Sequence, residues 1–211
     1  MKLTIAICTF NRGDRLRRLV TALRAQQSSL AIDILFVNNN STDDTLSVLD
    51  AMAADSGFPL HYVTERRQGI SHARNRAIEE TLVRGSDYML VMDDDELPLP
   101  GWVDAAVAAF HECDADCVGG RVKVVFDETP RPAWLGDDLL GFLAEADHGE
   151  EPFWISTTTT PVWTANVAYN MRVFRENPDL RFDSRYNREG KGVGGGEDVI
   201  MFESLLERGL R

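Results

Sequence analysis

Short apolar runs alternate along this chain with segments of helical periodicity. Residues 3–8 (LTIAIC), 32–37 (IDILFV) and 88–92 (YMLVM) are such runs, and their β-branched content and polar flanks indicate buried strands. Between them, apolar residues recur every three to four positions, which is typical of one helical face. Strands that alternate with helices fold into a parallel sheet covered on both faces. The pattern therefore predicts an α/β protein.

The other elements follow from the same periodicities. Asp14 is predicted to cap the first helix, which runs to about residue 27, and Ser41 the second. We expect short strands near 61–64 and over 164–170. Further helices are predicted over 71–83, after residue 101 and over 198–208.

The alternation stops between residues 127 and 163, where acids, prolines and aromatic residues predominate. The aromatic residues favour an ordered excursion from the sheet over a disordered insertion. Trp134, Trp154 and Trp163 have two interpretations here. They stack on a sugar or lie against a lipid-linked acceptor, or they fill the core beneath the excursion, as large aromatic residues usually do.

Composition excludes several classes of protein. The net charge of −12 disfavours nucleic acid as a partner, and no apolar run approaches the ~18 residues of a membrane span. Three cysteines form no disulfide framework, which favours a reducing, cytoplasmic setting. Cys113 and Cys117 lack the second thiol pair or nearby histidine of a metal site, so we expect them only to pack.

Polar loops follow three of the predicted strands. The first is Thr9–Arg12, the second Asn38–Ser41 and the third Asp93–Glu96. Because ligands of such sheets bind at the carboxyl ends of the strands, we expect these loops to form one site.

The third loop consists of four adjacent carboxylates that raise each other's pKa. A divalent cation removes that repulsion, and oxygen ligands suit Mg²⁺ or Mn²⁺. The alternative is a solvated acidic turn in which Asp94 or Glu96 caps the next helix.

Basic and glycine-rich segments complete the list of candidates. Arg74 suits a diphosphate, whereas Arg67 and Arg76 are expected to be surface charges. The stretch 190–195 matches GxGxxG, but no apolar strand precedes it, so we predict a loop over an active site rather than a dinucleotide fingerprint. Glu197 and Asp198 follow it and begin the last helix.

Five segments, in order, resemble the inverting family 2 glycosyltransferases of the GT-A fold: ICTFNR, FVNNNSTDDT, GISHARNRAI, MLVMDDDELPLPGW and GGGEDVIMFESLLERG. The resemblance implies a single GT-A domain over 1–211, a Rossmann-like three-layer sandwich with a mostly parallel central sheet. Residues 1–125 would bind the nucleotide sugar, and 126–211 would carry acceptor binding and catalysis. Relatives usually continue beyond this point, so the second half is interpreted as either shortened or minimal.

The resemblance also implies residue roles. Thr9, Phe10 and Asn39 would border the nucleotide base, although Asn38 and Asn39 replace the acids of many relatives. Arg74 would contact the phosphate or ribose, and Asp93 the ribose or sugar. The expected donor-binding set is Thr9, Phe10, Asn11, Arg12, Asn39, Arg74, Asp93 and Asp94.

Asp95 would hold Mg²⁺ or Mn²⁺ on the diphosphate, and Asp198 would be the general base. The implied reaction moves a sugar from a nucleoside-diphosphate sugar, foremost a UDP-sugar, to a sugar or lipid-linked sugar acceptor in surface polysaccharide or glycolipid synthesis. The expected location is the cytoplasm or, as a peripheral protein, the inner face of the membrane. Two other classes stay open: a metal-dependent nucleotidyltransferase or phosphohydrolase, and a non-catalytic nucleotide-sugar-binding module.

Overall fold

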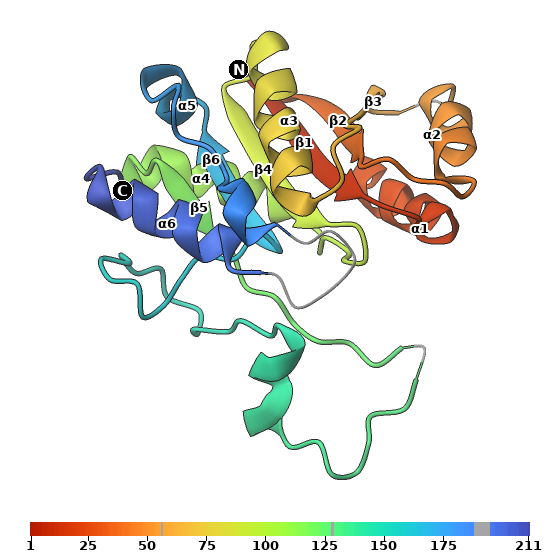
Figure 1. Ribbon diagram of the computed structural model, residues 1–211. Helices are drawn as coiled ribbons and strands as arrows, with labels where there is room; N and C mark the ends of the chain where they lie inside the picture. The colour runs from red at the N-terminus through yellow and green to blue at the C-terminus, as the bar shows by residue number, and fades with distance from the viewer. Residues whose placement is uncertain (56, 128, 188–194) are drawn as a thin grey trace.

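A six-stranded sheet forms the centre of the protein. The computed structural model describes residues 1–55, 57–127, 129–187 and 195–211, and the strand order is β3-β2-β1-β4-β6-β5 (Figure 1). The first four strands in chain order, β1 to β4, are parallel, and β6 runs antiparallel to both of its neighbours. The strands are β1 (Lys2–Thr9), β2 (Ala31–Asn38), β3 (Leu60–Thr64), β4 (Tyr88–Asp93), β5 (Cys117–Gly119) and β6 (Asn166–Asn170). The predicted mostly parallel α/β sheet is confirmed.

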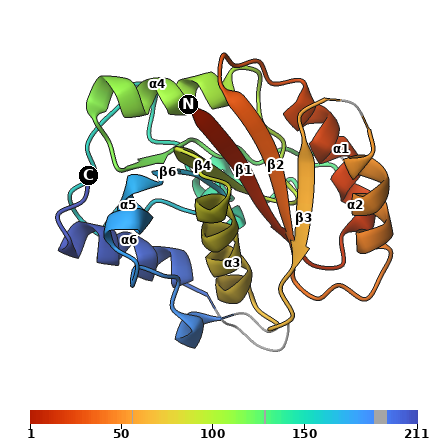
Figure 2. The same cartoon turned by 90° about the horizontal axis from the view of Figure 1, so that it is seen from above.

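Helices cover both faces of the sheet, which gives three layers (Figure 2). One apolar cluster joins the sheet to α1 (Gly13–Arg24), α2 (Thr45–Ala53) and α4 (Trp102–Cys113). A second cluster joins the other face to α3 (Ile70–Val83), α5 (Arg172–Glu176) and α6 (Glu197–Glu207). The apolar spacing in α1 was a reliable guide, because Leu16, Leu19, Val20 and Leu23 are all buried.

Several local predictions were wrong. Neither β5 nor α5 was predicted, because three and five residues are too few to show a period. Asp14 lies inside the first turn of α1, and the residue at the N-cap is Arg12. The N-cap of α2 is Asp44, and Ser41 instead accepts a hydrogen bond from another loop.

The excursion leaves the sheet after β5 and returns at β6, carrying the 3₁₀ helix η1 (Asp137–Leu143) away from the body of the molecule (Figure 1). A bridge between Val122 and Ala146 closes its base. Trp134, Trp154 and Trp163 are 75%, 49% and 38% exposed. The interpretation that these rings fill the core is therefore wrong.

The described residues contain no helix with the length and apolar character that crossing a membrane requires. All three cysteines are free thiols.

Gly69, at the start of α3, is a position where only glycine fits. Its φ is 129°, and a Cβ placed there overlaps the amide of Asn187. That amide accepts a hydrogen bond from Ser71 N at 3.1 Å and donates one to Gln68 O at 3.1 Å. The amide therefore has no room to retreat without losing both contacts, which fasten α3 to the segment after η2 (Ser184–Tyr186).

Gly69→Ala is expected to lower the free energy of unfolding by about 3 kcal/mol, because backbone strain adds to the clash. Gly85→Ala is the matched control, since Gly85 has a φ of 69° with open space around it. It is expected to cost only about 1 kcal/mol. Urea denaturation measures both, and equal losses would mean that the Asn187 contact contributes nothing.

Candidate functional site

The three polar loops lie at one edge of the sheet, as the sequence predicted. Thr9, the last residue of β1, pairs with Asn38, the last of β2. On the other side, Cys8 pairs with Asp93 at the end of β4. The loops after β1, β2 and β4 therefore start side by side.

The first two loops are tied together through Asn11 and Ser41. Asn11 N donates to Ser41 Oγ at 2.9 Å, and Asn11 Oδ1 accepts from Thr42 N at 2.8 Å. Asn11 and Asn40 have φ angles of 53° and 62°, a left-handed conformation that asparagine tolerates better than most residues. The amide of Asn11 thus shapes the loop, while Phe10 beside it is 41% exposed.

The acidic run does not converge on one point. Asp94 Oδ2 accepts from Thr9 Oγ1 at 2.6 Å, and Asp95 lies 3.9 Å from the guanidinium of Arg12. Glu96 Oε2 accepts from Asp93 N at 3.2 Å. Desolvation raises the pKa of Asp93 and of Asp94, and burial together with the charge of Asp93 raises the pKa of Glu96 to about 8. The neighbouring carboxylates also raise these pKa values, in the predicted direction, but burial is the larger cause.

The described residues hold no cluster of three or more metal-binding side chains. The carboxylate of Asp95 nevertheless suits a metal site with one protein ligand. Its side chain is 44% exposed, and its distance of 3.9 Å from the guanidinium of Arg12 is long for an ion pair. Mg²⁺ commonly takes one or two protein carboxylates and completes its shell with water and phosphates. The donor set is thus compatible with a cation that is shared with a ligand.

Asn39 has a different environment from the one expected. It is 5% exposed, and its amide nitrogen donates to Glu65 O at 3.2 Å and to Arg67 O at 2.8 Å. Its Oδ1 accepts from Gly69 N at 2.7 Å. The amide of Asn39 therefore holds the 65–69 loop in place, and a position of Asn39 at the border of the nucleotide base stays a prediction.

Arg74 is buried at the same edge, with 6% exposure. Its guanidinium forms an ion pair with Glu197 and lies 3.6 Å from Asp93. It also lies 5.6 Å from the ring centre of Phe182. Burial lowers the pKa of Arg74, but the two carboxylates outweigh it and the net pKa is raised. These partners favour a positioning role, and the contact of Arg74 with the donor phosphate or ribose stays a prediction.

The surface arginines behave as predicted. Arg67 pairs with Glu65 at 3.0 Å and Arg76 with Glu80 at 2.7 Å.

Asp198 arrives at this edge from the far end of the chain. It occupies the first turn of α6, where its Oδ1 accepts from Val199 N at 2.9 Å. Its charge acts on both Asp93 and Arg74. The structure thus brings the start of α6 to the acidic run, as the resemblance implied. The loop predicted to cover the site, 190–195, lies outside the described residues except for Gly195.

Sequence reasoning missed the pairing of Arg74 with Glu197. The carboxylate is 4% exposed, and its second oxygen has no hydrogen-bond partner among the described residues. An acid before Asp198 in a helical first turn signals only a helix-dipole contact. No local pattern could have identified its partner on α3.

A cavity of about 1110 Å³ adjoins the acidic run. Asp94 and Asp95 line one part, and Trp102 and Asn166, which are joined by a 2.8 Å hydrogen bond, line another. Its basic lining residues are Arg15, Arg18, Arg121 and Lys123. The cavity is large enough for a polar ligand of several rings.

Similarity to known proteins identifies the family. The model of the family described as glycosyl transferase family 2 matches residues 4–177. The chain belongs to this family. Among curated relatives, the uncharacterized glycosyltransferase YfnE of Bacillus subtilis is 30% identical over 119 residues, which are 56% of this chain and 29% of YfnE.

Solved structures of glycosyltransferases share the fold. A mannosyltransferase from Pyrobaculum calidifontis in complex with GDP-Man and Mn²⁺ has a TM-score of 0.69 at 18% identity, covering 99% of this chain and 53% of the other. S. aureus TarS 1–349 in complex with UDP-GlcNAc has a TM-score of 0.57 at 20% identity, covering 87% and 49%. Such identities show the fold alone. This family 2 chain spans about half the length of each of these two structures and less than a third of the length of YfnE.

Arg74→Met is expected to lower the free energy of unfolding by about 3–5 kcal/mol, because it leaves the carboxylate of Glu197 buried without its cation. Arg76→Met, on the same helix, removes only an i,i+4 pair and is expected to cost about 0.5 kcal/mol. The double variant Arg74→Met/Glu197→Met is expected to regain much of the loss. Chemical denaturation measures all three, and similar values for the two single variants would contradict a buried ion pair.

Proposed function

We propose that this family 2 chain transfers a sugar from a nucleoside-diphosphate sugar to an acceptor hydroxyl, with inversion at the anomeric carbon. The observation that carries the proposal is that Arg74 pairs with Glu197, the residue before Asp198, and lies 3.6 Å from Asp93, beside a cavity that Asp94 and Asp95 line. Inverting displacement needs a base on the acceptor side and stabilisation of a departing diphosphate. Carboxylates from two distant segments supply the groups for both tasks.

The donor is proposed to bind over the loops after β1, β2 and β4. Thr9 orients Asp94 through its hydroxyl, and Arg12 faces Asp95. Asn11 and Asn39 support the donor site indirectly, because their amides hold the loop backbones in place. We take the donor to be a UDP-sugar, while the solved relatives described above hold GDP-Man and UDP-GlcNAc.

Asp95 is the proposed ligand of a divalent ion, Mg²⁺ or Mn²⁺. When bound, such an ion neutralises charge that develops on the leaving diphosphate. Asp93 lies 3.6 Å from the buried guanidinium of Arg74, which engages its carboxylate within the protein. Asp95 is the carboxylate of the DxD run Asp93–Asp95 that we assign to the ion, because its partner Arg12 is more distant, at 3.9 Å.

Asp198 is the proposed general base. It accepts the proton of the acceptor hydroxyl as that oxygen bonds to the anomeric carbon and the nucleoside diphosphate leaves with the bonding electron pair. The ion pair of Arg74 with Glu197 fixes the helix turn on which Asp198 lies. The setting we propose, surface polysaccharide or glycolipid synthesis in the cytoplasm or at the inner membrane face, follows from the family resemblance.

A nucleoside diphosphate is expected to raise the melting temperature only when a divalent ion is present. UDP, GDP and dTDP are compared, each with Mn²⁺, Mg²⁺ or EDTA, because a ligand of the folded state stabilises it in proportion to saturation. We expect a shift with UDP that disappears in EDTA. A shift unaffected by EDTA would contradict the metal site, and turnover that releases pyrophosphate would indicate a nucleotidyltransferase instead.

Asp95→Asn is expected to abolish the metal-dependent part of this shift, because an amide is a weak ligand for Mg²⁺. Asp104→Asn, an exposed acid on α4, is the control and keeps the shift. Equal shifts in both variants would exclude Asp95 as the ligand.

Asp198→Asn is expected to lower the rate of nucleoside diphosphate release by about 10²–10⁴-fold. Donor affinity should stay near that of the wild type, because the base contacts the acceptor. The assay uses a panel of nucleotide sugars that carry the nucleoside diphosphate identified by the thermal shifts, with glycerol as a surrogate acceptor. Glu207→Gln, exposed at the other end of α6, serves as control. Wild-type rates in Asp198→Asn would refute the assignment.

A further inference from the structure

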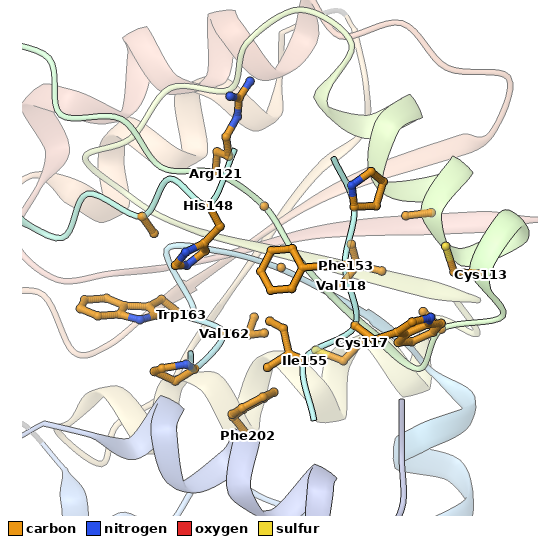
Figure 3. Close-up of a pocket in the computed structure, with 18 of the residues that line it drawn as sticks. Cys113, Cys117, Val118, Arg121, His148, Phe153, Ile155, Val162, Trp163 and Phe202 are labelled. Carbon is orange, nitrogen blue, oxygen red and sulfur yellow. The ribbon is translucent and has the colours of Figure 1, made fainter. Parts of the chain in front are cut away.

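A second cavity, of about 410 Å³, lies between the outer strand of the sheet, α6 and the excursion. Figure 3 shows Phe153 near its centre, with Val118, Ile155 and Val162 around the ring and Phe202 rising from the helix below. Its walls are mainly apolar. The exposed fractions of Phe153, Trp154 and Trp163 are 53%, 49% and 38%, so much aromatic surface here is left open to water.

Two arginines that line this cavity have partners. Arg121 lies 3.6 Å from Asp147 and 3.7 Å from Glu150. The guanidinium of Arg211 lies 4.3 Å from the ring centre of Trp154.

The cysteines of the wall offer no chemistry of their own. Burial raises the pKa of the Cys117 thiol to about 12, so this group stays protonated and is a poor nucleophile or metal ligand. Cys113 lines the same wall from α4. The Cys117 thiol thus behaves as apolar surface, in line with the packing role predicted for it.

The two cavities share part of their lining. Residues 118–122 and Pro152 border both the apolar cavity and the large cavity that contains Asp94 and Asp95. A single molecule that extends along the shared lining would have one end near Asp94 and Asp95 and the other against Phe153 and Phe202. Carboxylates at one end and aromatic rings at the other match an amphipathic molecule.

We propose that the apolar cavity binds the hydrocarbon tail of the acceptor, whose hydroxyl-bearing head lies in the large cavity. The inference rests on the proposed function only in taking the head as the acceptor. Covering the exposed rings with a hydrocarbon chain removes apolar surface from water, which is the source of affinity. The acceptor is thus a lipid-like molecule rather than a free sugar.

Titration calorimetry with 1-hexanol, 1-octanol and 1-decanol tests the tail site without turnover. Affinity is expected to rise by about fourfold for each added methylene, the factor for moving one CH₂ out of water. Binding is expected to carry a negative heat-capacity change, the mark of apolar burial. An affinity that does not change with chain length would overturn the proposal.

Phe153→Ser is expected to weaken decanol binding by about tenfold, because the ring lines the cavity and is half-covered in the free protein. Phe142→Ser is the matched control: it removes the same ring from the same excursion, but Phe142 is 87% exposed and lies outside the cavity. It is expected to leave the affinity unchanged. Equal losses in the two variants, or none in Phe153→Ser, would show that the alkanol binds elsewhere.

The melting-temperature shift with UDP and Mn²⁺ is measured on the same samples. If the shift is present and alkanols bind without chain-length dependence, the tail site is wrong while the proposed function stands. If alkanols bind as expected and no nucleoside diphosphate binds, the proposed function fails and the apolar site remains. Free glucose or galactose is titrated in the same calorimetric experiment. Binding of either sugar at the concentrations at which decanol binds would also overturn the tail site, because it would identify the aromatic rings as a sugar-stacking surface.

Discussion

A single buried guanidinium holds together the parts of the chain that form the candidate site. Arg74 lies on α3, its ion-pair partner Glu197 on α6, and the nearby Asp93 at the end of β4. Taking these charges out of water is costly, and the cost is offset only while all three keep their places. The position of Asp198, one residue after Glu197, is therefore a consequence of this interaction. The network makes the geometry of this edge of the sheet depend on the packing of α3 and α6, two helices that are distant in the chain and cover the same face of the sheet.

The loops at the same edge are built on a related principle. Side-chain amides of asparagine serve as fixed cross-links between backbones: Asn11 joins the loops after β1 and β2, and Asn39 anchors the loop before α3. The amides of these residues form their hydrogen bonds within the protein. Asp94 and Asp95 line the large cavity, and the ring of Phe10 is exposed. Preorganised backbone costs a ligand less on binding than mobile backbone does.

The excursion between β5 and β6 adds a different kind of surface. This segment exposes several aromatic rings and helps to enclose a cavity beside the one that Asp94 and Asp95 line. Aromatic rings in one cavity and carboxylates in the adjoining one suit the amphipathic acceptor that we propose. The proposed donor site of this chain thus relies on charge and hydrogen bonds, and the proposed tail site on apolar contact.

The amino-acid sequence by itself determined the alternating strands and helices, the edge at which the polar loops meet, and the crowding of the acidic run. Each of these follows from local periodicity or from residues adjacent in the chain, together with the rule that parallel strands end on one side. Only the tertiary structure decided that Arg74 pairs with Glu197, that the amide of Asn39 is spent on a loop, and that the three tryptophans of the excursion lie in the open. Those outcomes depend on which distant segments pack together. A one-dimensional pattern contains no distance between such segments, so burial, hydrogen-bond satisfaction and ion-pair partners could not be read from it.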